Sequence, residues 1–160
     1  MREGWLLPLM FAICLPAGAQ QGADQEKNKQ IARSFFEEVL DQGRLEKYGE
    51  SHAADFVVHG RQRDGTLEED MAAAREERKA LPDMRIKVNL MVAEGDLVAV
   101  YWTASGTNTG VGMGLPATGK TIQVGGMTFF RFKAGKISEE WSAWDRLTVM
   151  RQAGLLPPAQ

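Results

Sequence analysis

The chain has 160 residues, of which 25% are charged, and its formal net charge is -2. This length suits one domain with a single sizeable core, and the composition is that of an ordinary soluble globular protein. No stretch concentrates Lys and Arg, which argues against a surface for nucleic acid or for an anionic membrane.

The N-terminus has a pattern of its own. A short polar start precedes an apolar run from Trp5 to Pro16 and the small residues Ala17-Gly18-Ala19. This is the layout of a secretory signal peptide, and the apolar run is too short to span a bilayer as a mature helix. We therefore predict that residues 1–19 are a signal peptide and that the protein is secreted or periplasmic, with no membrane attachment after cleavage. The alternatives are an apolar helix packed on the fold and a lipid anchor through Cys14.

Removal of this segment would leave a chain without cysteine, because Cys14 is the only one. Disulfides, thiol catalysis and thiolate metal sites would then all be excluded. No group of His and carboxylate residues has ligand spacing in the sequence, so we predict no metal. We interpret residues 20–27 as a short tether and residues 28–156 as one domain.

Helical signals dominate the first half of the domain. Apolar residues at helical spacing predict an amphipathic helix from Asn28 to about Gly43, and residues 44–49 follow as a second, short helix. Thr66 and Glu69 match a capping box at the start of a helix that Pro82 stops. We interpret the charged run 75–79 in that helix as a solvated face.

Strand signals dominate the second half, after a first short strand at 55–59. Met84, Ile86, Val88 and Leu90 alternate on one face of a strand, and three longer strands follow at 97–105, 121–132 and 136–145. Hairpin turns are predicted at Gly95 and Gly135, and a short helix closes the chain at 146–153. This order predicts an α+β fold in which a curved antiparallel or mixed sheet wraps around the N-terminal helices. The interior of such a sheet is the default place for a small-molecule site.

One carboxylate stands where the last strand meets the closing helix. Because side chains alternate along a strand, Trp141, Ala143 and Asp145 share one face. An acid beside an apolar wall has a raised pKa, which suits proton transfer near neutral pH. The alternative is that Asp145 simply caps the helix that follows.

Several short motifs in this region belong together. They are Gly106-Thr107-Asn108, Gly114-Leu115-Pro116-Ala117-Thr118-Gly119-Lys120, Arg131, Gly135-Lys136-Ile137, Glu140-Trp141, Asp145 and Gln152-Ala153-Gly154. With them, the chain resembles the SnoaL-like polyketide (ester) cyclase family of the nuclear-transport-factor-2-like superfamily over roughly residues 28–156. The resemblance implies a cone-like fold, a homodimer and cofactor-free acid/base catalysis on a small, apolar, carbonyl-containing molecule.

The resemblance also assigns roles to residues. It makes Asp145 the proton shuttle, while His59 and Asn108 would hydrogen-bond the developing enolate oxygen. Asn108 stands where the family usually has a His, and an amide cannot titrate as His does. Taken alone, a His at a strand end such as His59 is more often a hydrogen-bonded structural residue. His52 is predicted to be solvated.

Candidate contacts for the substrate are apolar or aromatic side chains that could equally belong to the core. They are Trp102, Met127, Phe129, Trp141 and Phe35. The Gly/Pro-rich segment 108–120 is either a flexible rim over the cavity mouth or a plain hairpin connection.

Two functions follow from these observations. The first is an exported enzyme that catalyses an aldol-type cyclisation or an isomerisation. The second is a non-catalytic binding module with the same pocket, which the export signal favours because polyketide assembly is cytoplasmic. Fold alone does not decide between them.

Overall fold

The structure, a computed structural model, describes residues 17–60 and 62–157. Most of the predicted signal peptide therefore lies outside the described residues. Within these ranges, no helix combines the length and the apolar character that crossing a bilayer requires.

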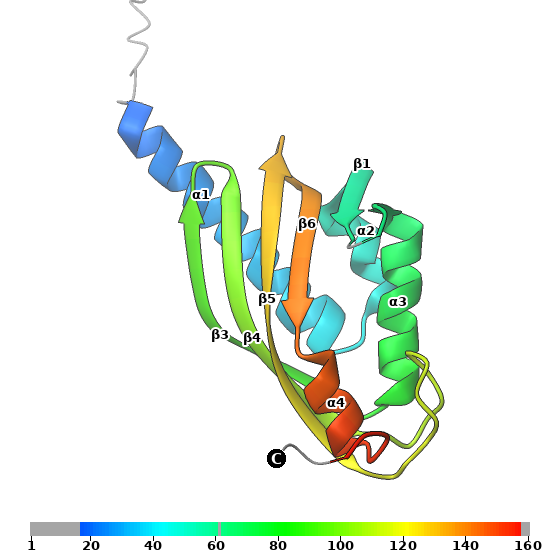
Figure 1. The fold of residues 1–160 in the computed structure, drawn as a ribbon. Coiled ribbons are helices and arrows are strands. Elements are labelled where there is room, and N and C mark those ends of the chain that lie inside the picture. Colours follow the sequence, from blue (N-terminus) through cyan, green and yellow to red (C-terminus); the bar gives the residue numbers. More distant parts are fainter. Residues whose placement is uncertain (1–16, 61, 158–160) are drawn as a thin grey trace, which may run out of the picture.

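The centre of the fold is an open, curved sheet of six strands in the order β2-β1-β6-β5-β4-β3 (Figure 1). β1 runs parallel to β6, and all other neighbours are antiparallel. The strands are β1 (His52–His59), β2 (Gly65–Thr66), β3 (Arg85–Glu94), β4 (Leu97–Thr107), β5 (Thr121–Lys133) and β6 (Lys136–Trp144). The predicted α+β class and the mixed sheet are confirmed.

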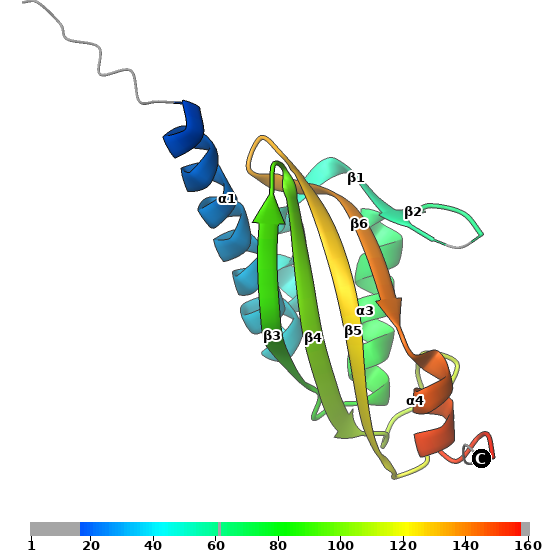
Figure 2. The same ribbon diagram turned by 60° about the vertical axis from the view of Figure 1, so that its left-hand side comes forward.

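Helices lie against one face of this sheet and across its end (Figures 1 and 2). They are α1 (Ala17–Ser34), the π-helix η1 (Phe35–Asp41), the 3-10 turn η2 (Leu45–Lys47), α2 (Tyr48–Ser51), α3 (Leu67–Ala80) and α4 (Arg146–Gln152). Residues 20–27, predicted as a tether, instead belong to α1. The capping box of α3 is confirmed in both halves, since Thr66 Oγ1 accepts from the Glu69 amide and the Glu69 carboxylate accepts from the Thr66 amide.

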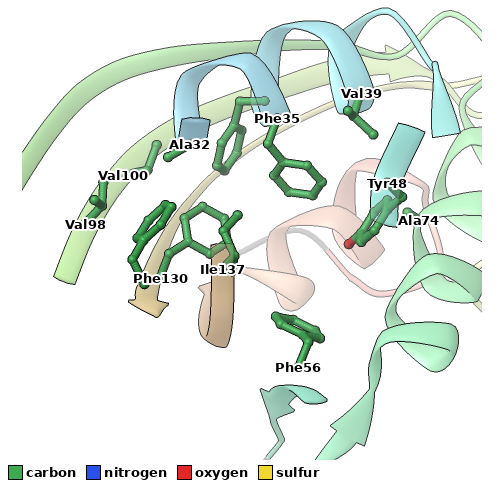
Figure 3. Packing of buried hydrophobic residues seen from close by; sticks show 12 residues of the cluster. Ala32, Phe35, Val39, Tyr48, Phe56, Ala74, Val98, Val100, Phe130 and Ile137 are labelled. Carbon is green, nitrogen blue, oxygen red and sulfur yellow. The ribbon is translucent and has the colours of Figure 1, made fainter. Parts of the chain in front are cut away.

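The main core lies between η1 and the inner face of the sheet (Figure 3). The rings of Phe35 and Phe130 meet edge to face at a centroid distance of 5.9 Å, and Phe35 also contacts Tyr48 at 4.9 Å. Phe130 and Ile137 are completely buried. This aromatic packing attaches the helical layer to β5 and β6 and so fixes one wall of the cavity described below.

A bulge changes the face that β3 presents. The pairing with β4 shifts between Val88 and Leu90, which leaves Asn89 as the extra residue. The alternation reverses there, so Leu90 is 61% exposed and does not share the inner face of Ile86 as the sequence pattern predicted.

The glycine-rich segment 108–120 packs on the last turn of α3. A Cβ at Gly110 would lie 1.9 Å from the carbonyl oxygen of Lys79, and one at Gly112 would lie 2.3 Å from that of Glu76. Glycine is required at both positions because the two backbones approach so closely. The segment therefore closes the cavity at one end, where Met113 and Leu115 contribute to its lining.

Candidate active site

A cavity of about 350 Å³ lies between the inner face of the sheet and the helices η1 and α3. Most of its lining is apolar: Phe35, Phe36, Leu40, Val58, Ala73, Ala74, Leu81, Met84, Ile86, Trp102, Ala104, Met113, Leu115, Ile122, Val124, Phe130, Trp144 and Val149. Its polar lining consists of Tyr48, Asp70, Glu77, Thr128, Glu140 and Ser142. A mainly apolar cavity with a few convergent polar groups is the usual form of a small-molecule site.

Asp70 and Glu140 form the acidic centre of the cavity. Asp70 lies on α3 and accepts a hydrogen bond from the hydroxyl of Tyr48 on α2. Glu140 lies on β6, and only 8% of it is exposed. Three elements that are distant in the sequence thus place a phenol and two carboxyl groups together.

A chain of hydrogen bonds ends on Glu140. The indole N–H of Trp102 donates to Thr128 Oγ1 at 3.0 Å, Thr128 and Ser142 are 2.8 Å apart, and Ser142 donates to Glu140 Oε1 at 2.6 Å. Ser142 has one hydroxyl proton and gives it to Glu140, so Thr128 must be the donor to Ser142. Each hydrogen bond in this chain therefore donates in the direction of the Glu140 carboxylate. The chain fixes the orientation of that carboxylate on β6.

Burial sets the protonation of these groups. Burial, with a further contribution from the charge of Asp70, raises the pKa of Glu140 to about 8. The same two causes raise the pKa of Glu77 to about 7. Burial also raises the pKa of Asp70 against the opposing hydrogen bond from Tyr48, and it raises the pKa of Tyr48. Carboxyl groups that titrate near neutral pH can both give and take a proton under physiological conditions.

His52 stands behind the acidic centre and is 4% exposed, which corrects the prediction of a solvated residue. Its Nδ1 lies 2.8 Å from the carbonyl oxygen of Tyr48, and burial lowers its pKa to about 4. Its Nε2 is buried and has no partner in the described part of the chain.

His52, Asp70 and Glu140 are also the residues that could hold a metal ion. Each offers one ligand atom, and these atoms lie within 4.8 Å of one another. Spacing along the sequence does not reveal this group, because its members come from β1, α3 and β6.

Two of the predicted substrate contacts, Phe35 and Trp102, do line the cavity. Trp102 can lie flat over β5 because its neighbour is Gly126, where a Cβ would come within 2.3 Å of the indole. The other three predicted contacts point to the opposite, outer face of the sheet. Met127 and Phe129 are 55% and 45% exposed, and Trp141 stacks on His59 at a centroid distance of 4.4 Å.

Asp145 lies outside the cavity, at the N-terminus of α4. Its carboxylate accepts from the Thr148 amide at 3.0 Å and from the Thr148 hydroxyl at 2.7 Å. These hydrogen bonds lower its pKa, and the residue is exposed. The prediction of a raised pKa was therefore wrong, because the side chain caps a helix at the surface instead of facing an apolar wall.

The two residues predicted to assist Asp145 also lie elsewhere. His59 contacts Glu139 at 2.8 Å and Asp64 at 3.2 Å outside the cavity, and the hydrogen bond with Glu139 raises its pKa. Asn108 is completely buried but organises the loop: its amide donates to the carbonyls of Ala80 and Gly110 and accepts from Thr118. The structure does not bring Asp145, His59 and Asn108 together around the cavity.

The structure thus combines an α+β fold with an apolar cavity whose lining includes Tyr48, Asp70 and Glu140. A family model described as SnoaL-like polyketide cyclase matches residues 30–153. The chain belongs to this family.

Several solved structures share this fold. IdmH from Streptomyces antibioticus is 27% identical, with a TM-score of 0.69 over 79% of this chain and 98% of the other. AclR from Streptomyces galilaeus is 22% identical, with a TM-score of 0.78 over 85% and 86% of the two chains. A SnoaL-like polyketide cyclase from Agrobacterium tumefaciens is 21% identical, with a TM-score of 0.66 over 78% and 96%. A comparison with curated proteins found no significant match.

Proposed function

We propose that the protein catalyses proton transfer at a carbon next to a carbonyl group, leading to an aldol-type cyclisation or an isomerisation, without a cofactor. The observation that supports this most is the meeting of Tyr48, Asp70 and Glu140 in the lining of a mainly apolar cavity. The family assignment agrees with this class of reaction.

In this mechanism the Glu140 carboxylate takes a proton from the carbon, and the electron pair of the C–H bond moves onto the carbonyl oxygen. The enolate oxygen accepts a hydrogen bond from Asp70, whose raised pKa favours the protonated, donating form, while the hydroxyl of Tyr48 donates to the other oxygen of the Asp70 carboxyl group and orients it. In a cyclisation the enolate carbon then attacks a second carbonyl carbon of the same molecule. In an isomerisation Glu140 returns the proton to another carbon.

The experiment is hydrogen–deuterium exchange at the methyl group of 4′-propylacetophenone in D₂O, followed by NMR. Proton transfer at carbon should give exchange above the buffer rate, and treatment with EDTA should leave that rate unchanged. Binding of the ketone without exchange would favour the alternative of a non-catalytic binding module. Loss of exchange in EDTA, with recovery on adding Zn²⁺, would instead favour a metal held by His52, Asp70 and Glu140.

Proteins of this family often form dimers, and we propose that this one pairs through the outer face of its sheet. That face carries exposed apolar side chains on β3, β4 and β5: Leu90, Val92, Tyr101, Met127 and Phe129. An apolar patch of this kind is a common mark of an interface. Light scattering after gel filtration should give a dimer for the wild type and a monomer for Met127→Glu. Leu147→Glu, on the exposed side of α4, should stay a dimer.

We also propose that the protein is exported, because the sequence before Gln20 has the layout of a signal peptide. Mass spectrometry of protein from its native host should give a chain that starts at or near Gln20. An intact Met1 would contradict export by cleavage.

A further inference from the structure

The cavity has an unbalanced charge. Asp70, Glu77 and Glu140 line it, and none of the described lining residues is Lys or Arg. The basic residue next to Glu77 turns away, since Arg78 donates to the carbonyl oxygens of Leu40, Asp41 and Met84 between α3 and η1. The protein therefore offers no cation of its own to these carboxyl groups inside the cavity.

Glu77 differs from the other two acids in lacking a partner. Asp70 has the hydroxyl of Tyr48, and Glu140 has that of Ser142. For Glu77, burial and the charge of Asp70 account for the raised pKa, and no hydrogen bond from the described residues contributes. Glu77 is partly buried in the cavity lining, so its carboxyl group is open to a donor on the ligand.

The position of Glu77 separates it from the reacting centre. Asp70 and Glu77 are seven residues apart on α3, which is two turns or about 10 Å along a helix, and both face the cavity. A ligand held at Asp70 and Glu140 would thus reach Glu77 with its other end. Indole rings of Trp102 and Trp144 also line the cavity, and aromatic faces attract organic cations.

We infer that the substrate carries a protonated amine, and that Glu77 binds this ammonium group while the carbonyl lies at Tyr48, Asp70 and Glu140. The inference rests on the proposed function for the carbonyl end. An ammonium beside Glu77 would favour its ionised form and supply the missing donors. A ligand with a carboxylate at this end would be repelled by the same group.

Three ketones of similar size test the inference: 4′-(2-aminoethyl)acetophenone, 4′-propylacetophenone and 3-(4-acetylphenyl)propanoate. Calorimetry on the wild type should show the amine binding at least about tenfold more tightly than the propyl ketone, and the carboxylate most weakly. Equal binding of amine and propyl ketone by the wild type would overturn the inference without any need for a variant.

Glu77→Gln should lose the preference for the amine. Glu76→Gln is the matched control, because Glu76 is the next residue on α3, is exposed and pairs with Lys79 at 3.6 Å. It should keep the preference. An amine preference that persists in a folded Glu77→Gln protein would assign the effect to another group and overturn the role of Glu77.

Deuterium exchange separates this result from the proposed function. Exchange of the propyl ketone without a preference for the amine would leave the proposed function standing and reject the inference. A preference for the amine that depends on Glu77, without exchange of any probe, would support the ligand class and reject proton transfer.

Discussion

Replacing Glu140 by Gln should lower the rate of proton transfer at carbon by about 10²-fold or more. Gln keeps the shape of the side chain and can still accept from Ser142, whose hydroxyl lies 2.6 Å from the carboxylate, but it cannot take a proton. The loss should therefore appear in the rate constant, with ligand affinity nearly unchanged. Deuterium exchange into 4′-propylacetophenone is the measurement.

Asp145→Asn is the control for this variant. It removes a carboxylate that the sequence pattern made the first candidate, yet Asn can still accept from the Thr148 amide, which the carboxylate contacts at 3.0 Å. Because Asp145 lies outside the cavity, the exchange rate should stay close to that of the wild type. A large loss in Asp145→Asn, with Glu140→Gln active, would return the role to Asp145.

The pH dependence gives a second check on Glu140. Only the ionised carboxylate can accept a proton from carbon, and its pKa is raised to about 8. The exchange rate of the wild type should therefore rise between pH 6 and pH 8 and level off above. A rate that is constant over this range would contradict Glu140 as the base.

The fold was predictable because its signals are local. Alternating residues in β4 and β5, the capping box at Thr66 and the turn glycines at 95 and 135 each define an element without help from the rest of the chain. The interpretation of residues 20–27 as a tether did not hold, because no local signal marks them as helical. Residues 20–27 have no apolar stripe, and yet they continue the helix that the core holds further along α1.

The site was less predictable because its members come from separate elements. Asp70 and Glu77 were not singled out from the sequence, because α3 carries many charged residues. Their spacing with the buried Ala74 nevertheless puts them on the inner face of α3. That spacing was the signal that could have found them. For Glu140, alternation along β6 separates two faces, and the sequence pattern predicted that the face of Trp141 and Asp145 lines the cavity. Only the packing of η1 and α3 shows that the face of Glu140 lines it.

Asp145 shows that alternation along a strand no longer predicts the orientation of a side chain once the strand has ended. Its strand ends at Trp144, and the backbone turns into α4 at the next residue. The side chain therefore follows the geometry of a helix start instead of the face of β6. Whether a residue at a strand end faces the interior depends on that turn, which sequence periodicity does not describe.

Raising the pH from 6.5 to 8 should lower the free energy of unfolding, by up to about 2 kcal/mol through Glu140 alone. The folded protein holds the Glu140 proton up to about pH 8, whereas an unfolded Glu loses it near its model value of 4.5. In this interval the folded state binds more protons than the unfolded state. Stability must then fall as pH rises, and urea unfolding at several pH values measures the slope.

Other titratable groups also change the free energy of unfolding between pH 6.5 and pH 8, each in a direction set by its pKa shift. Glu77 has a raised pKa of about 7 and adds a fall of the same sign up to that pH. His59 also has a raised pKa, so its stabilising interactions are lost as pH increases, but its side chain is 27% exposed and solvent weakens the effect. His52 has its pKa lowered to about 4 from the ordinary value of 6.5, so it is neutral in the folded state while the unfolded state still holds part of a proton just above pH 6.5. It therefore adds a small rise in stability with pH that opposes the fall.

Glu140→Gln isolates the dominant contribution. The variant should lose most of the slope and be more stable than the wild type at pH 8, where the wild type must ionise a buried carboxyl group. Glu77→Gln should flatten only the part below about pH 7, and His59→Gln should change the slope little. A Glu140→Gln protein with the full wild-type slope would show that Glu140 is already ionised at neutral pH. Glu140 would then already be able to accept a proton at pH 6.5, and the exchange rate should no longer rise toward pH 8.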